Sequence, residues 1–310
     1  MKMKIGLLFG LLLYGHLTTC GQDRAELESP AELSHYFVDH SETDQRLVVT
    51  SNAGVTWKLE MAVGEGKPGG GCITALYVPS KSTKNLVETN LIQRHGGHLY
   101  GVLGLDNLEW RTTSSSGTQR KDLGRTNSDI VVDIIEASAL RIRLDISGKW
   151  SGVSGFTAEI TIEPTKIHKK IEIDFTASRN AYGMLWSVAG FAPGTIDRNG
   201  VRMFNPSGSS SGISLPVLEN TQFSSQFTNF EYPYEVEFPL VENEGFGLLM
   251  EVATMGVQDM TNKGLHALVL ADEGPEDRHL VFYPRYHSNP FTNDKYYVEY
   301  IWTLAHELRK

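Results

Sequence analysis

Short segments in which apolar and polar residues alternate recur along most of the chain. Leu140–Ile146 reads L-R-I-R-L-D-I, Thr157–Glu163 reads T-A-E-I-T-I-E, and Lys170–Phe175 reads K-I-E-I-D-F. A period of two places the apolar residues on one face of a β-strand, and no helical period persists over a useful length. The pattern therefore predicts an all-β protein, an antiparallel β-sandwich whose sheets each have one solvent-exposed face.

The same pattern extends to other segments, separated by stretches rich in glycine, serine, asparagine and aspartate. Further strands are predicted at Val55–Met61, Ile130–Glu136, Tyr234–Phe238, Leu248–Val252, Leu280–Tyr283 and Tyr296–Leu304. Loops are predicted at Gly64–Gly71, Thr112–Thr126 and Asn205–Ser214. No internal repeat and no shift in composition marks a boundary, so residues 46–310 are expected to form a single β-sandwich domain.

The first twenty residues have the pattern of a secretory signal peptide. The basic Met1–Lys4 precedes the apolar run Ile5–Leu13, and Cys20 follows soon after. The run is shorter than the roughly 20 apolar residues that a membrane-spanning helix needs. We therefore expect residues 1–20 to be a signal peptide and the protein to be secreted, periplasmic or lipid-anchored at the cell surface.

Two modes of processing remain open. Leu17–Gly21 resembles a bacterial lipobox, in which Cys20 would become the lipid-carrying amino terminus, although a bulkier Thr19 stands where glycine or alanine is usual. The alternative is a soluble exported protein cut near Cys20. In both cases residues 21–45 are expected to be a tether, and the membrane is a partner only through a lipid on Cys20.

Charge and cysteine content exclude some classes of protein. The formal net charge of -9 argues against a nucleic-acid partner, because no basic stripe is available to release counterions from phosphates. Cys20 and Cys72 are the only cysteines, so no disulfide framework is expected. Cys72 lies in an apolar run and is predicted to be a buried, inert thiol.

Two polar and aromatic clusters are the candidates for a functional site. The first, within residues 93–111, offers proton carriers, cationic clamps and a stacking surface: His95, His98 and Tyr100, then Arg94 and Arg111, then Trp110. The second, at the end of a predicted strand, contains Arg285, Tyr286, His287 and Asn289. The clusters are far apart in the sequence, so only the fold could bring them together.

The remaining histidines are predicted to be structural. His168 is expected in a solvated turn, and His266, His279 and His306 are isolated. No spacing typical of a metal site is present, so no metal or cofactor is evident. A structural calcium ion held by aspartates and carbonyl oxygens of the loops remains an open alternative.

Short motifs resemble the galactose mutarotase-like β-supersandwich group. Gly70–Leu76 followed by Lys84–Val87 resembles that group's opening hairpin. His95-Gly96-Gly97, followed by Gly101 and Trp110, resembles the H-G-G…G…W segment of aldose epimerases, whose histidine contacts the sugar. The resemblance covers roughly half of the chain and implies a supersandwich-like fold.

The chain departs from aldose epimerases where their catalytic acid lies. Residues 158–175 are similar to the group's paired central strands, which epimerases follow with an Asn-His-x-Tyr-Phe segment. The comparable stretch, Met184–Phe191, contains no histidine. Because mutarotation needs both an acid and a base, the resemblance implies the fold without ordinary epimerase activity.

The leading hypothesis is a polysaccharide lyase that cleaves a uronate-containing polysaccharide by β-elimination. Exported proteins of this fold include such lyases. The reaction needs a cation at the uronate carboxylate and a proton carrier at C5, and Arg94, Arg111 or Arg285 could clamp the carboxylate. His95, His98, Tyr100, Tyr286 or His287 could carry the proton.

Two alternatives belong to other classes. A non-catalytic carbohydrate-binding lipoprotein would stack sugars on Trp110, Trp150 or Trp186. A hydrolase or epimerase would use paired carboxylates such as Asp106 with Glu109. A lyase produces an unsaturated sugar, a hydrolase produces a saturated reducing end, and a binding protein produces neither.

Overall fold

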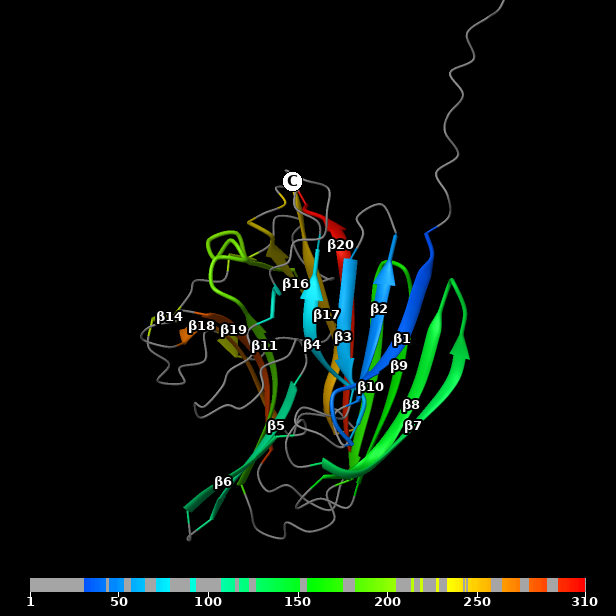
Figure 1. Ribbon diagram of the computed structural model, residues 1–310. Coiled ribbons are helices and arrows are strands. Elements are labelled where there is room, and N and C mark those ends of the chain that lie inside the picture. The colour runs from blue at the N-terminus through cyan, green and yellow to red at the C-terminus, as the bar shows by residue number, and fades with distance from the viewer. Residues whose placement is uncertain are drawn as a thin grey trace, which may run out of the picture. The chain divides into compact units, whose positions relative to one another are not determined.

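The chain is built from β-strands throughout the part that the structure describes (Figure 1). The computed structural model describes residues 31–42, 45–52, 57–64, 71–78, 90–92, 107–114, 117–122, 127–150, 155–174, 182–204, 213–214, 218–219, 227–228, 233–241, 243, 245–257, 264–273, 279–288 and 295–309. No helix occurs in these ranges, so none there is long and apolar enough to cross a membrane. The prediction of an all-β protein with antiparallel sheets is confirmed.

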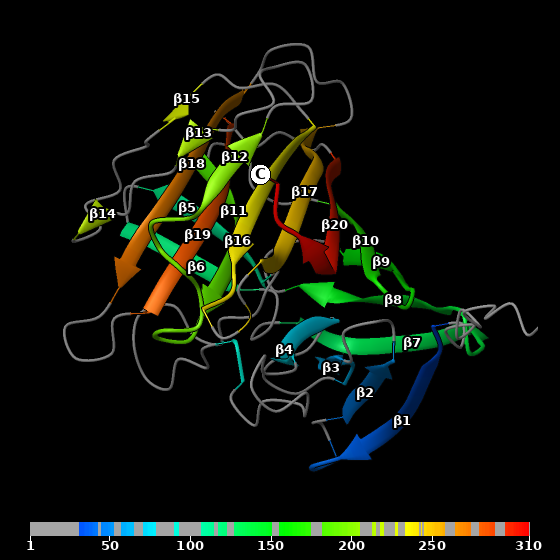
Figure 2. The ribbon, with the colours of Figure 1, turned by 90° about the horizontal axis from the view of Figure 1, so that it is seen from above.

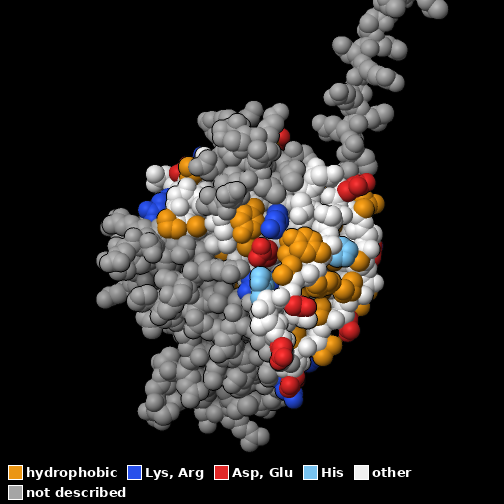
Figure 3. Space-filling model, viewed as in Figure 1, with side chains coloured by type: hydrophobic (Ala, Val, Ile, Leu, Met, Phe, Trp, Pro, Cys, Tyr) orange, Lys and Arg blue, Asp and Glu red, His pale blue; other side chains and the backbone are white. Residues whose placement is uncertain are grey.

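The amino-terminal sheet contains four described strands that pair in chain order. They are β1 (Leu33–Asp39), β2 (Gln45–Ser51), β3 (Trp57–Ala62) and β4 (Cys72–Tyr77). Strand β1 lies in the range predicted to be a tether, but it pairs with β2 along its whole length and belongs to the compact unit that begins at Ala31. The tether therefore does not extend to residue 45. Figure 3 shows apolar side chains gathered over this sheet, and Tyr36 and Phe37 of β1 are exposed.

The large sheet has the strand order β13-β12-β16-β17-β20-β10-β9-β8-β7. Its strands are β7 (Asn127–Ala137), β8 (Ile142–Trp150), β9 (Gly155–Ile162), β10 (Lys166–Asp174), β12 (Arg202–Phe204), β13 (Ile213–Ser214), β16 (Tyr234–Pro239), β17 (Phe246–Val257) and β20 (Lys295–Glu307). All of its described pairings are antiparallel.

The third sheet, here called the β11 sheet, has the order β14-β18-β19-β11-β5-β6, with β15 also paired to β18. Its strands are β5 (Asn107–Ser114), β6 (Gly117–Asp122), β11 (Tyr182–Phe191), β14 (Leu218–Glu219), β15 (Phe227–Thr228), β18 (Gly264–Glu273) and β19 (His279–Ser288). The predicted loop at Thr112–Thr126 is therefore wrong in part. Its residues 112–114 and 117–122 belong to the β5–β6 hairpin, and these residues are polar or glycine, so they carry no apolar alternation.

The alternation of apolar and polar residues in the sequence matches the alternation of buried and exposed residues in the large sheet. In β10, Ile167, Ile171 and Ile173 are buried, whereas the residues between them are at least partly exposed except for Lys169. Facing residues on β20 are buried in the same way, including Trp302 opposite Ile167. One face of the large sheet, its inner face, thus contributes to the hydrophobic core, and the opposite face is called the outer face below.

The other two sheets both contact the inner face of the large sheet (Figure 2). From the amino-terminal sheet, the Trp57 Nε1 donates a hydrogen bond of 2.7 Å to the Pro164 carbonyl oxygen, beside β9. From the β11 sheet, the Phe191 ring lies 4.9 Å from the ring of Phe238 on β16. The two sheets therefore form a second layer over the inner face, which is the arrangement of a β-sandwich.

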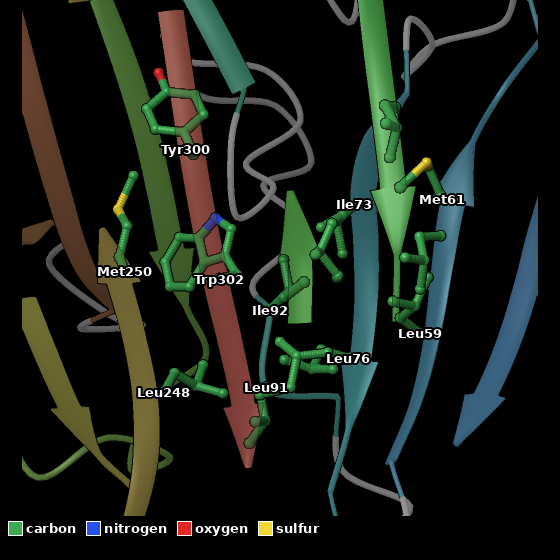
Figure 4. Packing of buried hydrophobic residues seen from close by; sticks show 14 of the residues in the cluster. Leu59, Met61, Ile73, Leu76, Leu91, Ile92, Leu248, Met250, Tyr300 and Trp302 are labelled. Carbon is green, nitrogen blue, oxygen red and sulfur yellow. The ribbon is translucent and has the colours of Figure 1, made fainter. Parts of the chain in front are cut away.

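Residues 90–92 join the two sheets of this second layer. The Leu91 amide donates to the Leu76 carbonyl of β4 at 2.9 Å, and the Ala192 amide donates to the Leu91 carbonyl at 2.8 Å. Ile92 also forms a β-bridge with Phe191. Figure 4 shows Leu91 and Ile92 in the core between Trp302 and the side chains of β4.

Lys169 interrupts the apolar inner face. It is only 1% exposed, and its Nζ donates a hydrogen bond of 3.0 Å to the carbonyl oxygen of Gly71, just before β4. This bond compensates part of the cost of burying the ammonium group. It also ties the start of β4 to the centre of the large sheet.

A side chain added at Gly71 is expected to cost more stability than one added at Gly194, which provides a matched control. Both have a positive φ, 76° and 73°, but a Cβ at Gly71 would lie 2.6 Å from Ile160 Cδ1, whereas a Cβ at Gly194 would meet nothing within 4 Å. Gly194→Ala should cost about 1–2 kcal/mol, the cost of the left-handed backbone conformation. Gly71→Ala should cost about 1 kcal/mol or more beyond that because the core must also shift. Urea unfolding measures both values, and equal losses would contradict the packing argument.

Candidate functional site

Strand β11 brings parts of the two predicted clusters together. On one side β11 pairs with β5, where Arg111 lies opposite Met184. On its other side β11 pairs with β19, where His287 lies opposite the same Met184. Trp186 likewise lies between Glu109 and Arg285. Segments separated by more than 170 residues thus lie two strands apart in one sheet.

The register divides the predicted residues between two faces. Residues directly opposite one another in antiparallel strands share a face, and neighbours along a strand lie on alternate faces. One face therefore holds the positions of Arg111, Arg285 and His287. The other face holds Trp110 and Tyr286, which both lie opposite Leu185.

Phe191 shows which face belongs to the core. It is fully buried and contacts Phe238 of the large sheet. Leu185 lies six residues before Phe191 on β11, so the two residues share a face, and Trp110 and Tyr286 lie on that face too. The positions of Arg111, Arg285 and His287 consequently lie on the face opposite the core, which we call the arginine face.

Further residues belong to the arginine face. Arg120 lies opposite Arg111, and Asp122 lies opposite Glu109, in the pairing of β6 with β5. On β11 itself, Tyr182 and Trp186 alternate with residues of the core face. Trp186 was expected only in the carbohydrate-binding alternative. Arg120, Asp122 and Tyr182 were not predicted, because the pairing of β5 with β6 and β11 leaves no local signal in the sequence.

The spacing and charge of the arginine face suit an anionic ligand. Adjacent strands lie about 4.8 Å apart, so the backbones at Arg111 and His287 are about 10 Å apart across β11. Arg285 lies two residues along β19 from His287, which is about 7 Å. Three arginines, Arg111, Arg120 and Arg285, share the face with three carboxylates, those of Glu109, Asp122 and Glu273. Glu273 lies opposite His279 at the other end of β19, so positive charges outnumber negative ones only in the part of the face around Arg111 and Arg285.

The rest of the predicted site lies outside the described residues. These positions are Arg94, His95, His98 and Tyr100 of the first cluster, Asn289 of the second cluster, and Asp106 of the carboxylate alternative. The described chain reaches Ile92, directly before the first cluster, and is held there by Asn90. The Asn90 Oδ1 accepts hydrogen bonds from the amides of Leu76, at 2.9 Å, and Ile92, at 3.0 Å.

Two histidines contact carboxylates in the structure. His306 Nε2 lies 2.7 Å from the Glu237 carboxylate, which is a structural contact of the predicted kind. His168 was expected in a solvated turn, and this prediction is wrong. It lies within β10 and contacts the Glu299 carboxylate at 2.6 Å, because β10 begins two residues earlier, at Lys166. Cys72 is buried in β4, as predicted.

No metal site can be assigned within the described ranges. None of the His, Cys, Asp and Glu side chains described there form a group of three or more that could hold an ion.

Comparisons with known proteins give only distant similarities. No family model matches the chain, and no curated protein matches it. Among solved structures, the heparan sulfate lyase HepC from Pedobacter heparinus matches 86% of this chain with a TM-score of 0.46 and 6% identity. The 4-alpha-glucanotransferase from Thermococcus litoralis matches 89% with a TM-score of 0.43 and 9% identity.

A galactose mutarotase-related enzyme from Lactobacillus acidophilus matches 89% of this chain and 99% of its own, with a TM-score of 0.41 and 7% identity. The matches cover only 36% of the heparan sulfate lyase and 41% of the glucanotransferase. Because identities and TM-scores are low in all three cases, the function of this chain has to be argued from its own residues.

Proposed function

We propose that the protein is an exported polysaccharide lyase that cleaves a uronate-containing polysaccharide on the arginine face. The observation that carries the proposal is the pairing of β5 and β19 with β11, which gathers Arg111, Arg285 and His287 on the face opposite the core. Export is proposed from the signal-peptide pattern of residues 1–20 and the lipobox-like sequence at Cys20.

The residue types match the needs of β-elimination. An arginine paired with the uronate carboxylate stabilises the negative charge that develops when the C5 proton leaves. His287 or Tyr182 is proposed to remove that proton. The electron pair then forms the C4–C5 double bond, the C4–O4 bond breaks, and a proton is delivered to O4. One proton is thus removed and one is returned, so no external reactant is needed.

The position of His287 also bears on the missing epimerase histidine. The stretch Met184–Phe191 has no histidine of its own, but β19 places His287 directly opposite Met184. The arginine face therefore holds an imidazole next to the strand that in epimerases would carry one. The arginines next to His287 favour an acidic sugar over a neutral one.

The proposal is tested by the ultraviolet absorbance of the mature protein incubated with uronate polysaccharides: alginate, glucuronan, ulvan, pectate and glycosaminoglycans. We expect absorbance from a C4–C5 unsaturated uronate to rise with one of them. A new saturated reducing end without that absorbance would indicate a hydrolase. Retarded migration in gels containing one polymer, without any product, would support the binding-protein alternative and contradict the lyase.

A further inference from the structure

We propose that the outer face of the large sheet holds a second binding site, for an uncharged, hydroxyl-rich saccharide, around Gly155, Glu172 and Lys295. The site lies on a different sheet from the arginine face. It does not depend on the lyase proposal, since it would take a ligand of different charge.

Three neighbouring strands supply the site through their register. Glu172 of β10 lies between Thr157 of β9 and Tyr297 of β20, and Asp174 lies between Gly155 and Lys295. These six positions share the outer face, because they alternate with the buried Phe156, Ile173 and Tyr296. Polar or aromatic side chains occupy five of the positions, and glycine occupies the sixth.

A hollow lies at the glycine. Gly155, Phe156, Thr157, Glu172 and Asp174 line an open pocket of about 270 Å³. This volume is just below the range for drug-sized ligands, about 300–1,000 Å³. Because Gly155 has no side chain, the backbone is exposed there, and Asp174 and Glu172 line the hollow.

Glu172 is already oriented by its neighbours. Its carboxylate forms an ion pair with the Lys295 ammonium and accepts a hydrogen bond from the Tyr297 hydroxyl. The contact with Glu172 raises the pKa of Lys295, and partial burial together with Glu172 raises the pKa of Tyr297. Lys295 therefore stays charged and Tyr297 stays protonated at neutral pH, and both lie next to the carboxylates that line the hollow.

The charges select the class of ligand. Two carboxylates, Glu172 and Asp174, line the hollow, and Lys295 beside it neutralises only Glu172, so an anion would be repelled. The described residues form no group of three side chains that could hold a metal ion. An apolar ligand would leave the carboxylates without water or hydrogen bonds. A neutral sugar remains, because each hydroxyl can donate to a carboxylate and accept from an ammonium group. The half-buried ring of Tyr297 adds an aromatic surface of the kind that binds partly apolar, partly polar groups.

Gly155→Val is the most direct test, because it fills the hollow without changing any charge. A Cβ at Gly155 would come no closer than 3.4 Å to another atom, the Gly148 carbonyl oxygen, and valine is favoured in strands. Calorimetric titration of the full chain with neutral xylo-, cello-, manno- and galacto-oligosaccharides should show saturable binding of at least one. Affinity for that ligand should fall at least tenfold in Gly155→Val and in Glu172→Gln.

Glu159→Gln is the matched control, since Glu159 is exposed on the same face of β9 and lies outside the hollow. Its affinity should equal that of the wild type. The absence of saturable binding across the panel would overturn the proposal, and so would unchanged affinity in both Glu172→Gln and Tyr297→Phe. These two variants decide the question if Gly155→Val fails to fold. Uronate cleavage should be unaffected by all of them, which separates this proposal from the lyase.

Discussion

Arg285→Ala is expected to lower kcat/KM for the uronate polymer by about 100- to 1,000-fold, the usual cost of removing one group that stabilises developing charge. Arg285 lies opposite Trp186 on the arginine face, next to the row of Arg111 and His287. Without this guanidinium group, the carboxylate of the bound uronate would be less neutralised, and the C5 proton of the uronate would be less acidic. The initial rate of the ultraviolet signal at low polymer concentration measures the effect.

A second arginine variant controls for loss of general charge. Arg143 is exposed on β8 of the large sheet, away from the arginine face, so Arg143→Ala should keep nearly full activity. Arg285→Lys should recover only part of the rate, because an ammonium group cannot make the bidentate contact. Wild-type activity in a folded Arg285→Ala variant would show that the second cluster has a structural role only.

Glu237→Ala is expected to reduce the free energy of unfolding by about 3 kcal/mol, at the lower end of the range for breaking a buried ion pair. The Glu237 side chain is 2% exposed. Its carboxylate lies 2.7 Å from His306 Nε2 and accepts a hydrogen bond of 3.3 Å from the Arg309 amide. Without the carboxylate, His306 and the end of the chain would lose the partner that holds them to β16. His306 and Arg309 are partly exposed, so water offsets some of the loss.

Thermal unfolding followed by circular dichroism measures the change. For a domain of this size we expect Tm to fall by about 6 °C or more. Glu159→Ala, an exposed carboxylate on β9, should change stability by less than about 0.5 kcal/mol. If the Tm of Glu237→Ala lies within about 1–2 °C of the wild-type Tm, roughly the shift expected for a surface change, the contact between Glu237 and His306 contributes little to stability.

Strands with one apolar face were predictable from the sequence. Predicted segments at Thr157–Glu163, Lys170–Phe175 and Tyr296–Leu304 fall largely within β9, β10 and β20. The β5–β6 hairpin was missed over residues 112–114 and 117–122, and so was β1 at Leu33–Asp39. Strand β6 and strand β1 are edge strands, where packing imposes a weaker pattern of alternation than in the centre of a sheet.

The candidate site could be predicted only as residue types. The sequence singled out Arg111, Arg285 and His287, but it also grouped them with Trp110 and Tyr286. The register places the latter two on the core face of the β11 sheet. It adds Arg120, Asp122 and Tyr182, for which no local pattern gave a signal.

The sequence by itself determined the all-β class and the apolar face of the central strands, because alternation with a period of two is local and burial enforces it. Tertiary structure decided which strands are neighbours. Pairing between β5, β11 and β19 joins segments whose separation carries no local signal, and a shift of one residue would move every side chain to the opposite face. The arginine face and the hollow at Gly155 both arise from such pairings, so neither could be found before the strands were aligned.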